Sequence, residues 1–203
     1  MDIFTLAAPI FDLAMKFSGH HKTLVELADR VKDEENKVDE SRKRQSTKLL
    51  DLGGGTGELP KYLPENIEVT IADPSEAMLK KALQKNYSQK VEHVVADGAE
   101  LPFEDNTFDY VTISDALHHF REVSQALSET ERVLKKGGKM FILEFDPDTA
   151  LTKTIIFFEK IAGEPVNFFK PEKLAGLLQK NGVETSHEYL NKSIYIMRAE
   201  KKE

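Results

Sequence analysis

Cysteine is absent from the 203 residues of this sequence. Disulfide bonds, thiolate nucleophiles and thiolate metal ligands are therefore excluded from its chemistry. Long hydrophobic runs are missing as well, because no stretch reaches 18 uninterrupted apolar residues, so we expect no membrane span and a cytoplasmic location. The apolar segment 3–17 carries Asp12 and Lys16 and has no basic leading region or small-residue cleavage site, so we do not expect a secretion signal.

Basic residues are also fewer than acidic residues. The sequence has 28 Lys and Arg against 35 Asp and Glu, a formal net charge of −7. Such a surface repels the phosphate backbone, so nucleic-acid binding is not expected, although a local basic patch stays open. The length and the 40% hydrophobic content predict a single domain over residues 1–203.

The N-terminal part has helical patterns. Apolar residues recur at helical spacing over 3–17, and Gly19 should end that helix. A second helix is predicted at 21–31, followed by a mixed-charge connector at 32–44. We expect residues 1–46 to form a helical lid and connector.

From residue 48 onward, short apolar runs alternate with helical patterns, which is typical of strand–helix units around a parallel sheet. The predicted strands are 48–52, 68–72, 92–96, 108–114, 139–145, 183–189 and 193–199, and the predicted helices are 58–63, 75–86, 123–135, 149–161 and 171–181. Gly137–Gly138 should end the third of these helices. The last two strands should pair antiparallel, because only a short turn separates them.

A cluster of glycines follows the first predicted strand. Gly53, Gly54, Gly55 and Gly57 would let the backbone turn tightly and approach a ligand closely. The dinucleotide pattern G-x-G-x-x-G would need a sixth-position glycine where Glu58 stands, which disfavours a nicotinamide-dependent oxidoreductase. Taken alone, the glycines are also compatible with a bend that binds nothing.

Acidic residues end the next two strands. Asp73 lies about 20 residues after the first glycine, where a carboxylate can accept hydrogen bonds from ribose hydroxyls. Asp97 follows the third strand and precedes Gly98. Because the carboxyl ends of parallel strands meet at one edge, we expect a nucleoside-binding site there.

With these features in place, residues 49 to about 145 resemble the S-adenosylmethionine (SAM)-binding core of class I methyltransferases, especially the group of quinone and sterol C-methylating enzymes. The segments DPSEAML at 73–79, LPFEDNTFD at 101–109 and VLKKGGK at 133–139 carry the resemblance further. It implies an α/β fold with a Rossmann-like, seven-stranded, mostly parallel sheet, helices on both faces and an antiparallel last strand. The SAM-binding core would be 47–146, with a C-terminal lid and closing strands at 147–203.

The resemblance also implies SAM as cofactor, S-adenosyl-L-homocysteine as product, and no metal. Asp51 and the turn 53–55 would hold the methionine part, Asp73 the ribose, and Asp97 with the following backbone the adenine, which Met78 would flank. The cofactor-binding residues predicted in this way are Asp51, Gly53, Gly54, Gly55, Asp73, Pro74, Met78, Asp97, Gly98, Ala99 and Ser114.

Two histidines follow the fourth strand. Histidine titrates near neutral pH, so His118 and His119 are candidates for the base that removes a proton from a methyl acceptor. Packing or helix capping is an equally open role for them. Because adjacent side chains should point in different directions, we expect no metal site between them. The quinone C-methylating enzymes have Arg-Asn at this place and Tyr-Asp where this chain has Phe11-Asp12, so the resemblance does not assign that activity.

The predicted function is methyl transfer from SAM to a small, apolar molecule. The first helix and the residues 155–158, 168 and 169 would line the acceptor pocket, or form plain core. A nucleic-acid or protein methyltransferase and a SAM-binding regulatory module without catalysis stay open as alternatives, but amino-directed base methyltransferases carry a proline–aromatic motif where this chain has 114–117. Arsenic methylation is set aside because it needs cysteine thiolates. The sequence predicts no oligomeric state.

Overall fold

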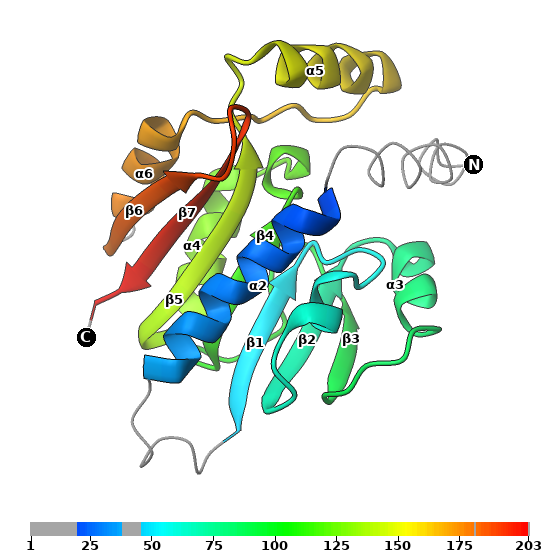
Figure 1. The fold of residues 1–203 in the computed structure, drawn as a ribbon, viewed down its shortest axis with the longest axis vertical. Coiled ribbons are helices and arrows are strands. Elements are labelled where there is room, and N and C mark those ends of the chain that lie inside the picture. The colour runs from blue at the N-terminus through cyan, green and yellow to red at the C-terminus, as the bar shows by residue number, and fades with distance from the viewer. Residues whose placement is uncertain (1–19, 38–45, 181, 203) are drawn as a thin grey trace.

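The computed structural model describes residues 20–37, 46–180 and 182–202 (Figure 1). The first predicted helix and Phe11–Asp12 lie outside these residues. The elements in chain order are α2 (His20–Lys37), β1 (Thr47–Leu52), the 3-10 helix η1 (Leu59–Tyr62), β2 (Ile67–Asp73), α3 (Glu76–Ala82), β3 (Val91–Val95), β4 (Phe108–Ser114), the 3-10 helix η2 (Leu117–His119), α4 (Val123–Val133), β5 (Leu134–Phe145), α5 (Ala150–Ala162), α6 (Pro171–Gln179), β6 (Val183–Tyr189) and β7 (Ile194–Lys201).

The strands form one seven-stranded sheet in the order β3-β2-β1-β4-β5-β7-β6. The pairs among β1 to β5 are all parallel, whereas β7 is antiparallel to both β5 and β6. The predicted seven-stranded, mostly parallel sheet with an antiparallel last strand is therefore confirmed. The carboxyl ends of β1 to β4 lie at the same edge of the sheet, and the predicted site residues lie at this edge.

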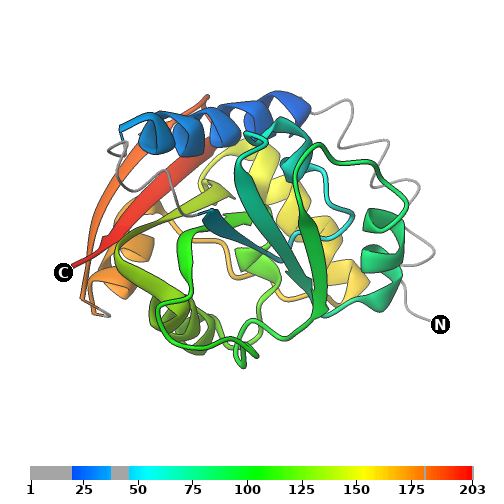
Figure 2. The same ribbon diagram turned by 90° about the horizontal axis from the view of Figure 1, so that it is seen from below.

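Helices cover both faces of the sheet (Figure 2). On one face, α2 contributes Leu24, Leu27 and Val31 to a core cluster that also contains apolar side chains of β1, β2 and β5. On the other face, α4 and α6 contribute Leu127 and Leu174 to a second core cluster. Central strands are buried from both sides in such an arrangement, which is why they read as continuous apolar runs in the sequence.

The glycine pair Gly137–Gly138 does not end a helix, contrary to the expectation from the sequence. The helix α4 ends at Val133, and Leu134 already pairs with Phe108 in the sheet. Pairing then shifts register and resumes at Lys139, so the chain between bulges outward with Gly137 in a left-handed conformation. The prediction for Gly137–Gly138 was wrong because a β-bulge uses glycine for the same backbone freedom that a helix end does.

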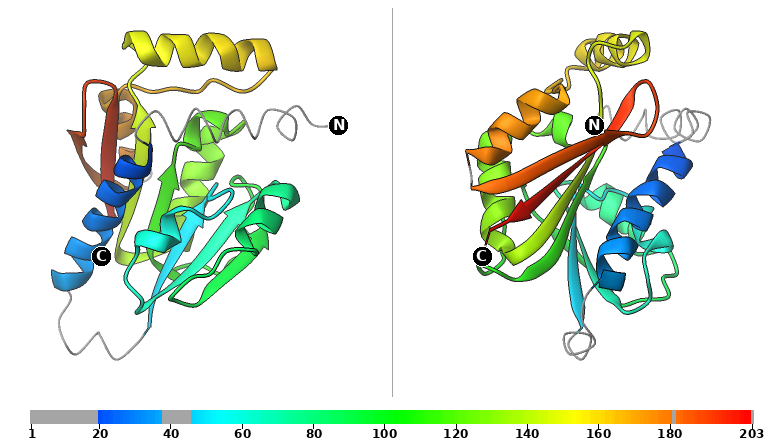
Figure 3. Two further views of the ribbon diagram at one scale, coloured as in Figure 1. Left: turned by 45° about the vertical axis from the view of Figure 1, so that its right-hand side comes forward. Right: turned by 60° about the vertical axis from the view of Figure 1, so that its left-hand side comes forward.

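Helix α5 lies across the carboxyl edge of the sheet, beyond the ends of the parallel strands (Figures 1 and 3). Thr149 caps it by accepting a hydrogen bond from the backbone N–H of Thr152, and Gly163 ends it in a left-handed conformation. The predicted helix at 149–161 is thus present, and its position makes it a cover for the candidate site. In the described ranges, no helix combines the length and apolar character needed to cross a membrane.

Candidate active site

The glycine turn after β1 has a backbone that only glycine adopts easily. Gly53, Gly55 and Gly57 have φ values of 72°, 53° and 71°. A Cβ at Gly53 would lie 2.5 Å from the Cβ of Ala116, and a Cβ at Gly54 would lie 2.5 Å from a carboxylate oxygen of Asp51. The turn therefore has no space for side chains where it meets its neighbours.

Asp73 ties this turn to the end of β2. Its side chain is 8% exposed and accepts hydrogen bonds from the backbone N–H of Gly55 at 2.9 Å and of Ser75 at 2.8 Å. Burial raises the pKa of Asp73 above its usual value, and these two N–H donors oppose the rise. An ionised carboxylate accepts more than two hydrogen bonds, so Asp73 retains acceptor capacity for a ligand's hydroxyls.

Asp51 is almost completely buried beneath the turn, at 1% exposure. The hydroxyl of Thr112 donates to its Oδ1 at 2.9 Å, while its Oδ2 has no hydrogen-bond partner among the described residues. Burial raises the pKa of Asp51 to about 7, and the nearby charge of Asp73 acts in the same direction. A cation bound at this edge would favour the ionised form of Asp51.

The other predicted cofactor residues lie at the same edge. Asp97 follows β3, is exposed, and accepts a hydrogen bond from the backbone N–H of Ala99 at 2.9 Å. Met78 is half-buried in α3, Pro74 precedes that helix, and Ser114 is the last residue of β4.

Phe120, which no sequence motif indicated, lies between two glycines of the predicted site. Its ring is 3.5 Å from the position of a Cβ at Gly53 and 3.1 Å from that at Gly98.

The two candidate catalytic histidines are in the short turn η2 that follows β4. Residues on both sides of them, Ala116 and Phe120, are close to the glycine turn. The loop after α5 is hydrogen-bonded to η2 and to the residue that follows it. The backbone N–H of Asn167 donates to the carbonyl of His118 at 2.9 Å, and the side-chain amide of Asn167 donates to the carbonyl of Phe120 at 2.7 Å. The histidines are thus fixed next to the predicted cofactor site.

His118 is buried at 3% exposure, and Glu144 at the end of β5 orients it. The ring Nδ1 lies 2.8 Å and 3.0 Å from the two carboxylate oxygens of Glu144, and the ring of Phe168 stacks on the imidazole at a centroid distance of 4.2 Å. Burial lowers the pKa of His118, but the Glu144 carboxylate outweighs burial and the net pKa is raised.

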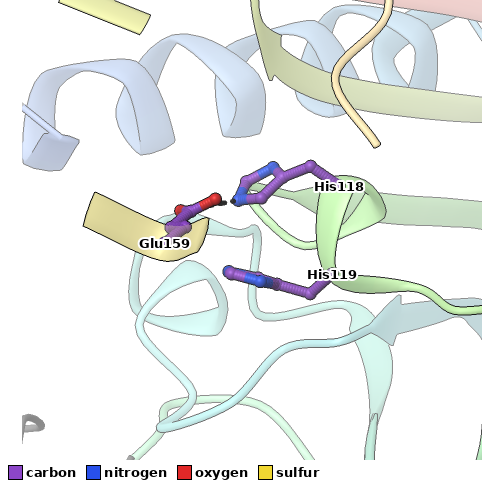
Figure 4. Close-up of side chains that lie close together, drawn as sticks. All are labelled: His118, His119 and Glu159. Carbon is purple, nitrogen blue, oxygen red and sulfur yellow. Dashed lines mark ion pairs between the residues drawn. The ribbon is translucent and has the colours of Figure 1, made fainter. Parts of the chain in front are cut away.

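His119 is the more exposed of the two and lies against His118, with ring centroids 4.2 Å apart. Glu159 of α5 approaches both rings (Figure 4), and its Oε1 is 3.7 Å from Nε2 of His118. Burial, with a smaller contribution from His118, lowers the pKa of His119 to about 3, whereas burial raises the pKa of Glu159 to about 7. The expectation that the two histidines point in different directions was wrong, because both rings turn toward the same overlying helix.

The predicted apolar acceptor cluster does not gather in one place. Ile155 and Phe168 pack beside the core cluster shared with α2, and Phe169 packs beside the other one. Phe157 and Phe158 are 60% and 63% exposed on α5. The cluster is thus neither plain core nor one closed pocket.

Two acidic residues of the site, Glu144 and Glu159, were also missed. Glu144 is the one charged residue within the apolar segment 140–145, whereas Glu159 follows the apolar run 155–158 and is next to Lys160. A lone charge in an apolar run signals a buried partner, but the sequence does not say which residue that partner is.

Comparison with known proteins adds sequence relatives to this geometry. Residues 50–142 match the family described as methyltransferase domain. The ubiquinone/menaquinone biosynthesis C-methyltransferase UbiE of Klebsiella pneumoniae is 36% identical over 165 residues, which cover 77% of this chain and 62% of that protein. The chain spans about half to three fifths of the length of the curated relatives it matches first.

Solved structures share the fold at lower identity. A SAM-dependent methyltransferase from Thermotoga maritima superposes with a TM-score of 0.75 at 19% identity, covering 98% of both chains. Phosphoethanolamine N-methyltransferase 2 of Haemonchus contortus, in complex with S-adenosylhomocysteine, gives a TM-score of 0.65 at 19% identity, covering 78% of this chain and 49% of that one. Residues 50–142 of this chain are thus similar to a methyltransferase domain, and the chain as a whole shares the fold of solved SAM-dependent methyltransferases.

Proposed function

We propose that this protein transfers a methyl group from SAM to a small, apolar molecule. The observation that carries the proposal is the shared edge of β1 to β4, where the glycine turn, Asp51 and Asp73 lie together. SAM supplies an electrophilic methyl group on a sulfonium cation. The buried Asp51 carboxylate, with one oxygen that accepts no hydrogen bond in the described part of the chain, suits a ligand that carries positive charge.

In this proposal each strand end has its own task. The turn 53–55 and Asp51 hold the methionine part, and Asp73 accepts hydrogen bonds from the ribose while it keeps Gly55 in place. Asp97 and the backbone of Gly98 and Ala99 hold the adenine, with Met78 at its flank, Pro74 before α3 and Ser114 lining the site from β4. These roles rest on the matching motifs and on the common edge.

The acceptor side of the site lies between η2 and α5. The exposed rings of Phe157 and Phe158 on α5 favour an apolar molecule, and the relatives' printed names point to quinones. His118 and His119 take the place of the Arg-Asn pair of quinone C-methylating enzymes, so we leave the acceptor broader than a quinone. Holding an acceptor in line with the methyl carbon is the main contribution that such a site makes to the rate.

Calorimetric titration of the full chain tests the cofactor part of the proposal. SAM and S-adenosylhomocysteine should bind with one-to-one stoichiometry and compete with each other, whereas NADH should give no heat. Incubation with methyl-labelled SAM and a panel of quinones, phenols and thiols should then label at least one acceptor. Folded protein that binds neither SAM nor its product would refute the proposal, and binding without transfer to any acceptor would favour a regulatory module.

The pH dependence of SAM affinity should follow Asp51. Because burial raises the pKa of Asp51 to about 7, the residue is mostly protonated at pH 6 and mostly ionised at pH 8. If cationic SAM binds the ionised form, its affinity should rise about tenfold from pH 6 to pH 8, in proportion to the ionised fraction. The charged group that faces Asp51 is Asp73, whose own raised pKa changes the slope in the same direction. The variant Asp51→Asn should flatten this dependence in calorimetry, and an equally steep slope in that variant would contradict the assignment.

A further inference from the structure

We propose that His118, His119 and Glu159 bind one divalent transition-metal ion of the zinc class. The three side chains come from two elements, η2 and α5, and lie close together (Figure 4). One ligand atom from each of them lies within 4.8 Å of the others. The proposal differs from the expectation of no metal, because that expectation assumed that the side chains of His118 and His119 point in different directions.

The spacing of the three groups fits a metal better than a direct contact. Nε2 of His118 and Oε1 of Glu159 are 3.7 Å apart, which is too long for a hydrogen bond. Ligands in a tetrahedral zinc site with bonds of about 2.0–2.2 Å lie about 3.3–3.6 Å from each other. A small movement of the Glu159 side chain would therefore complete the geometry.

His118 is held in the orientation of a metal ligand. Its Nδ1 contacts both oxygens of Glu144, which leaves Nε2 directed toward Glu159. A carboxylate on the far nitrogen of a histidine is the usual support of a ligand in zinc proteins, since it fixes both the tautomer and the ring plane. The stacked ring of Phe168 and the hydrogen bond from the backbone N–H of Asn167 also hold His118 in place.

The charge around the cluster also favours a cation. Two largely buried carboxylates, those of Glu144 and Glu159, lie against His118, which supplies at most one positive charge to balance them. Oε2 of Glu159 is buried without a hydrogen-bond partner among the residues described by the structure. Buried carboxylates are normally paired or bound to a metal, and a divalent ion would balance the excess here.

The donor set selects the kind of metal. Imidazole and carboxylate without thiolate suit zinc, and three protein ligands leave a fourth position open. The metal site lies near the glycine turn, because η2 follows Ala116, which contacts Gly53. There it would bind the anionic sulfur or oxygen of a small molecule whose proton is released to water. This use as an acceptor site rests on the proposed methyl transfer, whereas the metal site itself does not.

Metal titration of the full chain tests the proposal. After treatment with a chelator and removal of the chelator, the protein should bind one Zn²⁺ in calorimetry and give the visible absorption of tetrahedral Co²⁺. His119→Gln and Glu159→Gln should each lower Zn²⁺ affinity by about 100-fold or more, and Glu144→Gln, which removes the support of a ligand, by about 10–100-fold. The matched control His187→Gln, on the exposed side of β6, should bind as the wild type does. Circular dichroism checks that each variant is folded.

The outcome separates the metal site from the cofactor site. No stoichiometric Zn²⁺ or Co²⁺ binding by the wild type, or unchanged binding by folded His119→Gln and Glu159→Gln, would overturn the proposal. Titration of S-adenosylhomocysteine into the same metal-free protein reports the cofactor site on its own. If S-adenosylhomocysteine binds and zinc does not, the metal site is rejected and the proposed methyl transfer stands. If zinc binds and S-adenosylhomocysteine does not, the metal site stands and the proposed methyl transfer is rejected.

Discussion

Asp73→Ala should weaken the binding of S-adenosylhomocysteine by about 100-fold or more, which corresponds to about 2.7 kcal/mol. The carboxylate of Asp73 holds Gly55 and Ser75 by their backbone N–H groups, and in our proposal it also accepts hydrogen bonds from the ribose. Hydrogen bonds to a charged group contribute about 1.5–3 kcal/mol each. The loss of the ligand's hydrogen bonds and the loosening of the turn should together account for the expected loss of affinity.

Calorimetry on the variant and on a matched control measures this loss. Glu76→Ala changes an exposed acid three residues further along the chain and should leave the affinity within about twofold of the wild type. Thermal unfolding of Asp73→Ala shows whether the fold persists. If the folded variant binds the product nearly as tightly as the wild type, Asp73 does not hold the ribose.

Glu144→Ala should lower the free energy of unfolding by about 3–5 kcal/mol in metal-free protein. His118 and Glu144 have side chains only 4% and 1% exposed, and Nδ1 lies 2.8 Å from Oε1. Glu144 also accepts the backbone N–H groups of His118 and Phe145. Removing the carboxylate would leave a buried imidazole without its partner and two backbone donors unsatisfied.

Urea unfolding of chelator-treated protein measures this change. Glu184→Ala provides the control, because Glu184 pairs with Lys202 at 3.5 Å while their side chains are 75% and 64% exposed. Its loss should cost less than about 1 kcal/mol. The double variant His118→Leu/Glu144→Leu should recover most of the stability, since apolar pairs often replace buried ion pairs without loss. Equal costs for Glu144→Ala and Glu184→Ala would contradict the role of burial.

Local pattern predicted most of the sheet. The bounds of β4 and β6 agree with those expected from their apolar alternation, and the other strands differ by a few residues at their ends. Helices were less accurate, since α3 stops at Ala82 rather than near residue 86, and the helix expected at 58–63 is only the short turn η1. Helix ends depend on single contacts, such as Tyr87 donating a hydrogen bond to the carbonyl of Ala82, which a periodic pattern does not contain.

The sequence by itself determined the fold class and the edge that carries the cofactor motifs. The local sequence contains the glycine spacing, the acids at strand ends and the succession of strands along the chain. Parallel topology then places those strand ends side by side. Only the tertiary structure decided what surrounds the two histidines. Glu144 and Glu159 are 26 and 41 residues from His118, and their meeting depends on how β5 ends and how α5 crosses the sheet. Contacts between distant segments follow from the packing of whole elements, so a donor set made in this way leaves no spacing pattern in the chain.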